Sequence, residues 1–266
     1  MRFCLVNLKK VVKQESLLKK INLDLCLKSE ESHYIPKLGL DHIFPNPRFA
    51  SDYGLVAYGG DLNPNRILSA YRHGIFPWYS ENDPILWWSP NPRLVLFPTE
   101  FKTTKSFKKI LKNGRFEVYF DRDFKTVIQH CANIYRKGQE GTWIIDEIQE
   151  AYLQLHYMGF AHSIETYLDG ELVGGLYGID MGSGFYGESM FSLINNASKV
   201  ALRALSDVLA KKGYDFIDCQ VETPHLISVG AKLIDRDIFL NLVEESLKKS
   251  GLGNSWQNTI WKYQGE

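Results

Sequence analysis

Hydrophobic residues recur along the chain at two different spacings, and these spacings predict its helices and strands. Apolar residues three, four or seven positions apart indicate one face of a helix, whereas alternation or a short apolar run indicates a strand. Strands are predicted near Trp87–Trp88, Leu94–Phe97, Phe116–Phe120, Ala161–Leu168, Leu172–Ile179, Phe185–Phe191 and Phe216–Val221. Helices are predicted from Pro64 to about Gly74, at 104–112, at 123–133, from Asp146 to about Gly159, at 197–212, at 224–230 and at 235–249.

These predicted elements fall into segments of different character. In residues 1–35 lysines alternate with short apolar groups, which favours a loosely attached N-terminal extension. Residues 36–98 are dense in proline and glycine turns around one helix and short strands, and we expect a small N-terminal α+β domain there. Residues 99–250 are more regular and form the expected catalytic domain, followed by a C-terminal tail at 251–266.

The order of elements in the second domain predicts its architecture. A helix leads into two strands around Asp169–Gly170, a strong hairpin turn signal, and then come a strand, a helix and another strand. This order is typical of an acetyltransferase-like (GNAT-like) mixed-sheet α/β domain, in which helices cover the sheet and later strands splay to admit substrate. The predicted fold class of the whole chain is α+β.

The composition excludes several kinds of protein. Lys plus Arg and Asp plus Glu both number 31, so any contact with nucleic acid must come from a local patch. No apolar run approaches the ~20 residues of a membrane helix. Neither the four cysteines nor the seven histidines have metal-ligand spacing, and no phosphate-binding P-loop is present. We expect a reduced, cytoplasmic protein without membrane or metal.

Polar residues on two predicted strands form the main candidate site. Asp218 and Gln220 lie two apart and therefore share a strand face, with Cys219 on the other, and Glu188 and Met190 are paired likewise. If the strands are neighbours, two carboxylates and an amide converge beside apolar surface, which suits proton handling during acyl transfer. The alternative is that Asp218 and Gln220 are solvated surface groups.

Three further patterns have both a functional and a structural explanation. Leu202, Leu205 and Leu209 form one helical stripe that, with Leu176 and Met190, lines either a pocket for a large apolar side chain or simply the core. A basic run without intervening acids fits either a polyanion or a solvated helix face, and it contains Lys105, Lys108, Lys109 and Lys112. Aromatic residues in or near turn-rich segments suit either stacking on an unpaired base or the core, namely Tyr71, Trp78 and Trp143.

Blocks of residues along most of the chain resemble a known family. The matching blocks run in order and at family spacing from about 44 to 240: GLVAYGGDL (54–62), YRHGIFPWYS (71–80), PILWWSPNPRLVLFP (84–98), EGTWI (140–144), AYLQLHYMGFAHSIE (151–165), ELVGGLYG (171–178), FYGESMFS (185–192), NASKVAL (196–202), IDCQV (217–221) and GA (230–231). They are similar to bacterial leucyl/phenylalanyl-tRNA–protein transferases. The family has a small N-terminal domain and an acetyltransferase-like C-terminal domain, with no metal or nucleotide cofactor.

The resemblance implies an activity and a role for each candidate. Leu or Phe moves from charged tRNA to the N-terminal Arg or Lys of a protein and marks it for degradation by the N-degron route. Asp218 would be the base, Gln220 would orient the amine or donate to the oxyanion, and Glu188 would hold the cationic acceptor residue. The family's apolar pocket corresponds to Leu176, Met190, Leu202, Leu205, Leu209 and Ile217. Tyr71, Trp78 and Trp143 correspond to residues near the tRNA's terminal adenosine. The helix at 104–112, with its lysines, corresponds to the acceptor-stem surface.

Two positions depart from the family, and two other functions stay open. Lys105 stands where Arg is usual, so a bidentate phosphate contact is not expected there. Leu205 and Leu209 replace frequent Phe, a difference that bears on pocket width or Leu/Phe preference. A CoA-dependent N-acyltransferase would have the same topology, although no glycine precedes the helix near 197 to bind a pyrophosphate. A non-enzymatic adaptor for tRNA or N-terminal signals is the third possibility.

Overall fold

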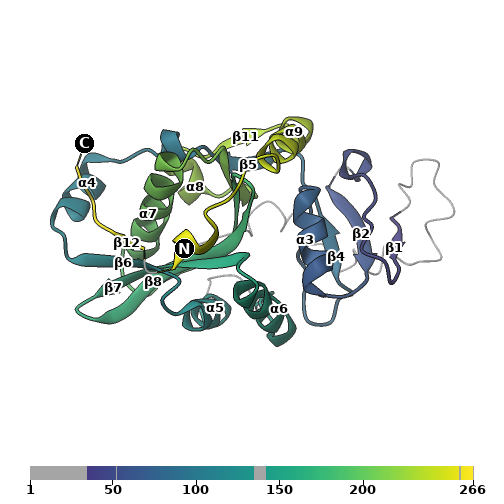
Figure 1. Ribbon diagram of the computed structural model, residues 1–266, viewed down its shortest axis with the longest axis horizontal. Coiled ribbons are helices and arrows are strands. Elements are labelled where there is room, and N and C mark those ends of the chain that lie inside the picture. Colours follow the sequence, from purple (N-terminus) through teal and green to yellow (C-terminus); the bar gives the residue numbers. More distant parts are fainter. Residues whose placement is uncertain (1–34, 52, 135–141, 258, 266) are drawn as a thin grey trace.

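The chain folds into two β-sheets with helices packed around them, as the computed structural model in Figure 1 shows. It describes residues 35–51, 53–134, 142–257 and 259–265. The smaller sheet has the order β1-β2-β4-β3 and consists of β1 (Lys37–Leu38), β2 (Leu55–Gly59), β4 (Leu86–Trp88) and β3 (Phe76–Pro77). The larger sheet has the order β11-β5-β10-β9-β8-β7-β6-β12. Its strands are β11 (Lys232–Ile234), β5 (Arg93–Leu96), β10 (Phe216–Gln220), β9 (Gly184–Ser192), β8 (Glu171–Met181), β7 (Ala161–Leu168), β6 (Phe116–Phe120) and β12 (Ile260–Trp261).

Helices cover both faces of the larger sheet. Helix α7 packs on one face of β7, β8 and β9, and helices α5 and α6 pack on the other (Figure 1). The helices are α3 (Pro64–Arg72), α4 (Lys105–Lys112), α5 (Phe124–Asn133), α6 (Asp146–Tyr157), α7 (Ala197–Lys211), α8 (Pro224–Ser228) and α9 (Arg236–Ser246). Short 3-10 turns are η1 (Pro47–Phe49), η2 (Pro98–Glu100) and η3 (Gly253–Trp256). The prediction of an α+β protein with a small N-terminal part and a mixed sheet is confirmed.

Local sequence signals explain where several elements begin and turn. The side chain of Asn63 accepts the backbone N–H of Asn65 at 2.9 Å, and Pro64 occupies the first helical position of α3. The hairpin between β7 and β8 turns at Asp169 and Gly170, whose φ angles of 52° and 83° are those of the predicted tight turn. These short-range predictions hold because the capping and turn residues act within two or three positions.

Two hydrophobic clusters lie on opposite sides of the larger sheet. The first, here called the tyrosine-side core, joins the small sheet and α3 to α5, α6 and α9, so the N-terminal part shares its interior with the rest. The second, the leucine-side core, lies under α4, α7 and α8 and includes the C-terminal residues Trp256 and Trp261. Because the described residues of 36–98 share this core, they form a lobe of the molecule.

Two boundaries differ from the sequence prediction. The strand expected at Leu94–Phe97 within the small domain is β5, which lies in the larger sheet between β10 and β11. All four residues of β5 are buried, which fits a strand with packed groups on both faces. The segment 251–266, expected as a tail, contributes β12 at the sheet edge beside β6. The extension expected at 1–35 lies, except for its last residue, outside the described residues.

No helix among the described residues has both the length and the apolar character needed to cross a membrane. The expectation that the chain is cytoplasmic is a separate prediction, which this finding leaves open.

Two hairpin glycines provide a matched test of packing. Gly170 and Gly182 both have positive φ, but a Cβ on Gly170 meets no atom within 4 Å, whereas one on Gly182 would overlap the backbone carbonyl of Ser246 in α9. We expect Gly170→Ala to lower the free energy of unfolding by about 1–2 kcal/mol through backbone strain alone. Gly182→Ala should lower the free energy of unfolding clearly more than Gly170→Ala, as measured by urea unfolding. Equal losses would mean that the turn between β8 and β9 does not dock on α9.

Candidate functional site

The polar residues predicted on two strands meet in the folded protein. Strands β9 and β10 are parallel neighbours, paired from Phe216–Gly184 to Asp218–Tyr186. Beyond Asp218 and Tyr186 the two strands are no longer paired, although β9 continues to Ser192. They therefore separate there. The side chain of Gln220 spans the separation, and its Nε2 donates to Oε1 of Glu188 at 2.8 Å. The predicted convergence of acid and amide is confirmed.

A β-bulge determines which way Glu188 points. Opposite it, Tyr177 and Gly178 are adjacent, but their partners are Ser189 and Gly187, so Glu188 is the extra residue in β9. Glu188 therefore contacts residues of the tyrosine-side core, whereas Met190 belongs to the leucine-side core. The expectation that Glu188 and Met190 share a face is wrong, because the extra residue breaks the alternation on which it depended.

Asp218 is held in a buried ion pair that the sequence did not reveal. Arg93 of β5 donates from Nε to Oδ1 at 2.8 Å and from Nη2 to Oδ2 at 2.6 Å, and both side chains have an exposed fraction of 0%. The guanidinium lies between the rings of Phe76 and Phe239, with centroid distances of 4.8 and 4.5 Å. Such a site fixes the arginine by charge, hydrogen bonding and ring stacking together.

The same carboxylate positions Gln220. Oδ1 of Asp218 accepts the backbone N–H of Gln220 at 2.9 Å. Gln220 has a φ of 62°, a left-handed conformation that is unfavourable for a non-glycine residue. The hydrogen bond to Asp218 thus stabilises a strained backbone that aims the amide of Gln220 at Glu188. The side chains of Asp218 and Gln220 lie on one side of β10, and Cys219 lies in the leucine-side core, as predicted.

Glu188 is buried and surrounded by hydrogen-bond donors. The hydroxyl of Tyr71 donates to Oε1 at 2.6 Å and that of Tyr152 donates to Oε2 at 3.0 Å, in addition to the amide of Gln220. Burial raises the pKa of Glu188 to about 7, while the two tyrosine hydroxyls act in the opposite direction. A carboxyl group with a pKa near 7 exchanges a proton readily at neutral pH.

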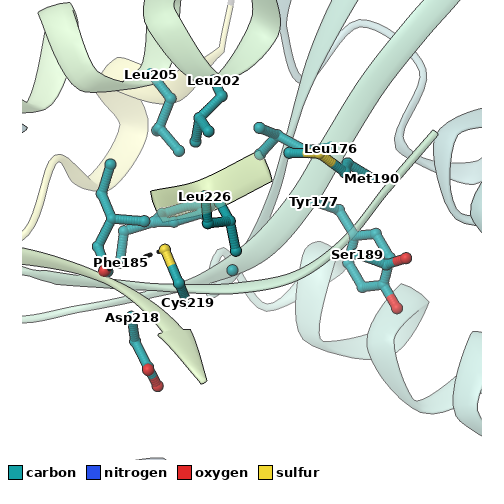
Figure 2. Close-up of a pocket in the computed structure, with 12 residues that line it drawn as sticks. Leu176, Tyr177, Phe185, Ser189, Met190, Leu202, Leu205, Asp218, Cys219 and Leu226 are labelled. Atoms are coloured by element: carbon teal, nitrogen blue, oxygen red, sulfur yellow. Dashed lines mark hydrogen bonds between the residues drawn. The ribbon is translucent and has the colours of Figure 1, made fainter. Parts of the chain in front are cut away.

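The predicted apolar pocket lies on the other face of the sheet. Figure 2 shows leucines of α7 above β10, with the carboxylate of Asp218 directed away from them. Of the expected pocket residues, five line this cavity, namely Leu176, Met190, Leu202, Leu205 and Ile217. Leu209 is buried in the same core but does not line the cavity. The lining also includes Gly187 and Cys219, which flank the separation of β9 and β10, so the pocket adjoins the polar site there.

The cavity is nearly filled by the residues that line it. Its volume is about 10 Å³, close to the minimum for one water molecule. Most of the lining residues are apolar, and Gly187, Ser189, Asp218 and Cys219 complete the lining where β9 and β10 pass. An aliphatic guest would therefore require the lining to move apart.

The three aromatic candidates occupy different surroundings. Tyr71 has an exposed fraction of 0% and its ring packs on Tyr186 at a centroid distance of 5.2 Å, so no ring face is open to a base. Trp78 and Trp143 are half-buried and pack at the edge of the tyrosine-side core. The expectation of base stacking fits the two tryptophans better than the tyrosine.

The basic candidates lie on α4 as the periodicity predicted. Phe107 and Leu111 are buried, Lys108 is half-buried, and Lys105, Lys109 and Lys112 are exposed. Thr104 caps the helix by accepting the N–H of Phe107. None of the four lysines forms an ion pair within the described part of the chain. The helix therefore presents an uncompensated positive face.

Sequence reasoning missed Arg93 and Tyr152. Arg93 opens the apolar run of β5, and a charged residue at the start of a buried strand was an available signal. Tyr152 lies on α6, and its hydroxyl contact with Glu188 depends on how α6 packs.

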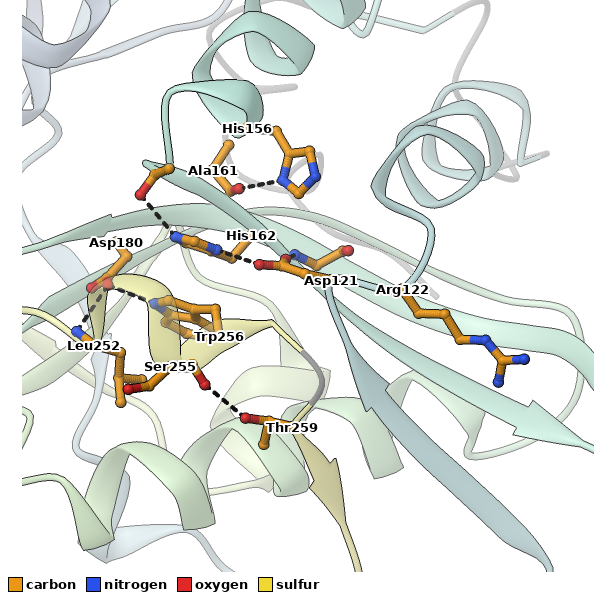
Figure 3. Close-up of polar contacts among 12 residues, drawn as sticks. Asp121, Arg122, His156, Ala161, His162, Asp180, Leu252, Ser255, Trp256 and Thr259 are labelled. Atoms are coloured by element: carbon orange, nitrogen blue, oxygen red, sulfur yellow. Dashed lines mark hydrogen bonds and ion pairs between the residues drawn. The ribbon is translucent and has the colours of Figure 1, made fainter.

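A second buried polar cluster, shown in Figure 3, anchors the C-terminal segment. Oδ2 of Asp180 accepts the indole N–H of Trp256 at 2.7 Å, and Oδ1 accepts the hydroxyl of Tyr214 at 2.8 Å. His162 pairs with Asp121 at 2.7 Å and stacks on the indole at a centroid distance of 4.5 Å. We interpret this cluster as structural. Among the residues that the structure describes, no group of three or more His, Cys, Asp or Glu is arranged to hold a metal.

Comparisons with known proteins identify relatives over most of the chain. Residues 95–244 match the family profile described as leucyl/phenylalanyl-tRNA protein transferase, and residues 60–91 match the profile of that protein's N-terminal domain. A leucyl/phenylalanyl-tRNA–protein transferase of Sulfurimonas denitrificans is 53% identical, covering 84% of this chain and 97% of that protein. One from Desulfatibacillum aliphaticivorans is 51% identical over 80% of this chain and 91% of that protein.

Among solved structures, L-PGS from Bacillus licheniformis aligns at 15% identity and a TM-score of 0.33, covering 57% of this chain and 48% of that one. A similarity at that level does not establish a shared fold.

The burial of the Arg93–Asp218 pair predicts how its variants change the free energy of unfolding. Arg93→Met leaves an uncompensated buried carboxylate, so we expect a loss of about 3–5 kcal/mol in the free energy of unfolding. Arg93→Met combined with Asp218→Asn removes both charges and should recover part of that loss, measured by denaturant unfolding as a double-mutant cycle. Strictly additive losses would show that the two side chains are not coupled.

Proposed function

Because the chain belongs to the leucyl/phenylalanyl-tRNA–protein transferase family and is thus an aminoacyltransferase, we propose that it moves Leu or Phe from charged tRNA to proteins with N-terminal Arg or Lys. The product would carry a destabilising N-terminus for degradation, the N-degron route. One observation carries the site assignment: Gln220 and Glu188 are joined at 2.8 Å where β9 and β10 separate, beside an apolar pocket.

The donor ester is already activated, so the site has to handle protons and orient two substrates. The acceptor's α-ammonium loses a proton and its nitrogen attacks the ester carbonyl. The C–N bond forms, the C–O bond to the ribose breaks, and the ribose oxygen takes up a proton. Glu188 is our proposed proton acceptor, because a buried carboxyl with a pKa of about 7 matches this task at neutral pH. The incoming ammonium would replace one of the donors that now surround Glu188.

Gln220 and Asp218 take supporting roles in this proposal. The amide of Gln220 orients the amine or donates to the developing oxyanion. Asp218, expected from the sequence to be the base, has both oxygens bound by Arg93 and no exposed surface. A carboxylate so enclosed is poorly placed to reach the acceptor. We therefore propose that Asp218 acts on Gln220 by holding its backbone.

The apolar pocket would receive the Leu or Phe side chain. The proposal requires opening, since a volume of about 10 Å³ admits neither. The β9–β10 separation offers the connection, because Gly187 and Cys219 border it on the pocket side and Glu188 and Gln220 lie on the other. The ester would lie in this separation.

The RNA contacts follow from the surface groups. Trp78 and Trp143 are proposed to stack on the terminal adenosine, and Tyr71 would join them only if its ring were uncovered. Lys105, Lys108, Lys109 and Lys112 are proposed to bind acceptor-stem phosphates, an interaction that weakens with salt. We also propose an acetyltransferase-like sheet, in line with the parallel β9–β10 pair and its separation, and a cytoplasmic enzyme that uses no cofactor.

A transfer assay tests the proposed function. The purified protein is mixed with labelled Leu-tRNA and a peptide that begins with Arg, and the same peptide with an acetylated N-terminus serves as control. We expect label only in the free-amine peptide. Gln220→Ala should lower kcat by roughly 100-fold, as the loss of an oxyanion donor does, while the exposed Gln154→Ala should not.

The alternatives predict other results. Release of a free thiol from acetyl-CoA in the presence of the peptide would indicate a CoA-dependent enzyme. Binding of tRNA and peptide without any label transfer would indicate an adaptor, and either result would overturn the proposed function.

The environment of Glu188 predicts a change in pH dependence. If the ionised carboxylate accepts the proton, kcat/KM rises with pH through about 7. The hydroxyl of Tyr71 lowers the pKa of Glu188, so Tyr71→Phe should raise that pKa and move the rising limb to higher pH. The acceptor amine also titrates, near pH 7.7–8.0 in ordinary peptides, but its pKa is the same for both enzymes.

Tyr119→Phe, on β6, is the matched control and should leave the profile in place. If Tyr71→Phe left the rise of kcat/KM at the same pH, or moved it to lower pH, Glu188 would be excluded as the titrating group.

A further inference from the structure

Two basic side chains lie beside the apolar pocket without any assigned role. Lys199 is in the first turn of α7, three residues before Leu202, and His225 is in α8, directly before Leu226. Leu202 and Leu226 both line the pocket. Lys199 and His225 therefore come from the same two helices that form the pocket wall.

Lys199 is fixed in place, yet its charge is uncompensated. Its Nζ lies 4.7 Å from the ring centroid of Phe107 in α4, a cation–π contact that restrains the side chain. No carboxylate in the described ranges forms an ion pair with it, and the first turn of α7 contains no acidic residue. Partial burial lowers the pKa of Lys199.

His225 adds an unsatisfied polar atom to this position. Its Nε2 is buried and has no hydrogen-bond partner. Burial, and after it the charge of Lys199, lowers the pKa of His225 to about 4, so the imidazole is neutral at pH 7. A buried nitrogen without a partner is costly and uncommon in native proteins. An anion between the two side chains would satisfy both.

We propose that Lys199 and His225 bind a phosphate group of the donor RNA, the 5′-phosphate of its 3′-terminal adenosine. The inference rests on the proposed function, because the ester in the pocket fixes which anion comes next. Only one ribose separates the ester from that phosphate. On the far side of Lys199, α4 carries Phe107 and the lysines proposed for the acceptor stem, so the phosphate lies on the path between the two sites.

The acceptor is a less suitable source of the anion. Its N-terminal residue is cationic and, in the proposed function, meets Glu188 on the tyrosine side of the sheet. Lys199 and His225 belong to the two helices on the leucine side, where Leu202 and Leu226 form the pocket wall. A peptide carboxylate would have to reach the opposite face.

Two small leucyl-donor substrates that differ only in this phosphate test the proposal. They are 3′-O-leucyl-adenosine and its 5′-phosphate, each assayed for transfer to the Arg peptide. For the wild type we expect KM to be about 10-fold lower with the phosphorylated donor, the effect of charge-assisted hydrogen bonds. Lys199→Ala should remove this difference without changing kcat for leucyl-adenosine, and Lys199→Arg should retain it.

Two controls separate this phosphate from other charges. Lys212→Ala, an exposed position at the other end of α7, should behave as wild type with both donors. Lys108→Glu combined with Lys112→Glu should impair use of full-length charged tRNA more than use of either small substrate, because the small substrates lack the acceptor stem.

A binding measurement is independent of catalysis. In an NMR titration, adenosine 5′-phosphate should raise the pKa of His225, whereas adenosine should not, because a bound anion favours the protonated imidazole. The His225 signal is identified by its loss in His225→Gln.

The outcomes distinguish this proposal from the proposed function. Equal KM values for the two donors with normal transfer, or an equal loss with both donors in Lys199→Ala, would overturn the phosphate site alone. No transfer from either donor or from charged tRNA would overturn the proposed function, and the NMR titration would still decide whether the phosphate binds.

Discussion

The buried pair of Arg93 and Asp218 is the interaction on which the rest of the site depends. Two full charges with no exposed surface are stable only when each satisfies the other, and here the contact is bidentate. The same pair joins β5 to β10 and sets the backbone of Gln220 in a conformation it would not otherwise adopt. Phe76 of the small sheet and Phe239 of α9 enclose the guanidinium, so the N-terminal lobe takes part in positioning the central strands.

The larger sheet keeps two kinds of chemistry apart. Polar groups gather on the tyrosine side, where Glu188 is surrounded by hydroxyl and amide donors, and aliphatic groups gather beneath α7. The separation of β9 and β10 is where the two sides meet. In the proposed reaction a single ester uses both, with its side chain on one face and its carbonyl near the other. Because the pocket is nearly filled, the proposed reaction requires its lining side chains to move apart when the substrate enters.

Much of the fold was predictable from local signals. The turn at Asp169–Gly170 and the helix at 104–112 depend on residues a few positions apart, and the structure reproduces them. The strand β5 was also recognised, but its sheet was not, because an apolar run does not specify its partner. The same limit explains the C-terminal segment, whose tryptophans become core residues only where Asp180 and α7 provide the surface.

By itself, the sequence determined the element types, the polar pair two apart on β10, and a family resemblance that the comparisons confirm. Only the tertiary structure decided which groups meet. Arg93 and Asp218 are 125 positions apart, and no periodicity relates them. The bulge at Glu188 depends on pairing with β8, and it reverses a face that strict alternation had assigned. Long-range pairing and burial, which the sequence does not display, therefore determine how the acid, amide and arginine work together.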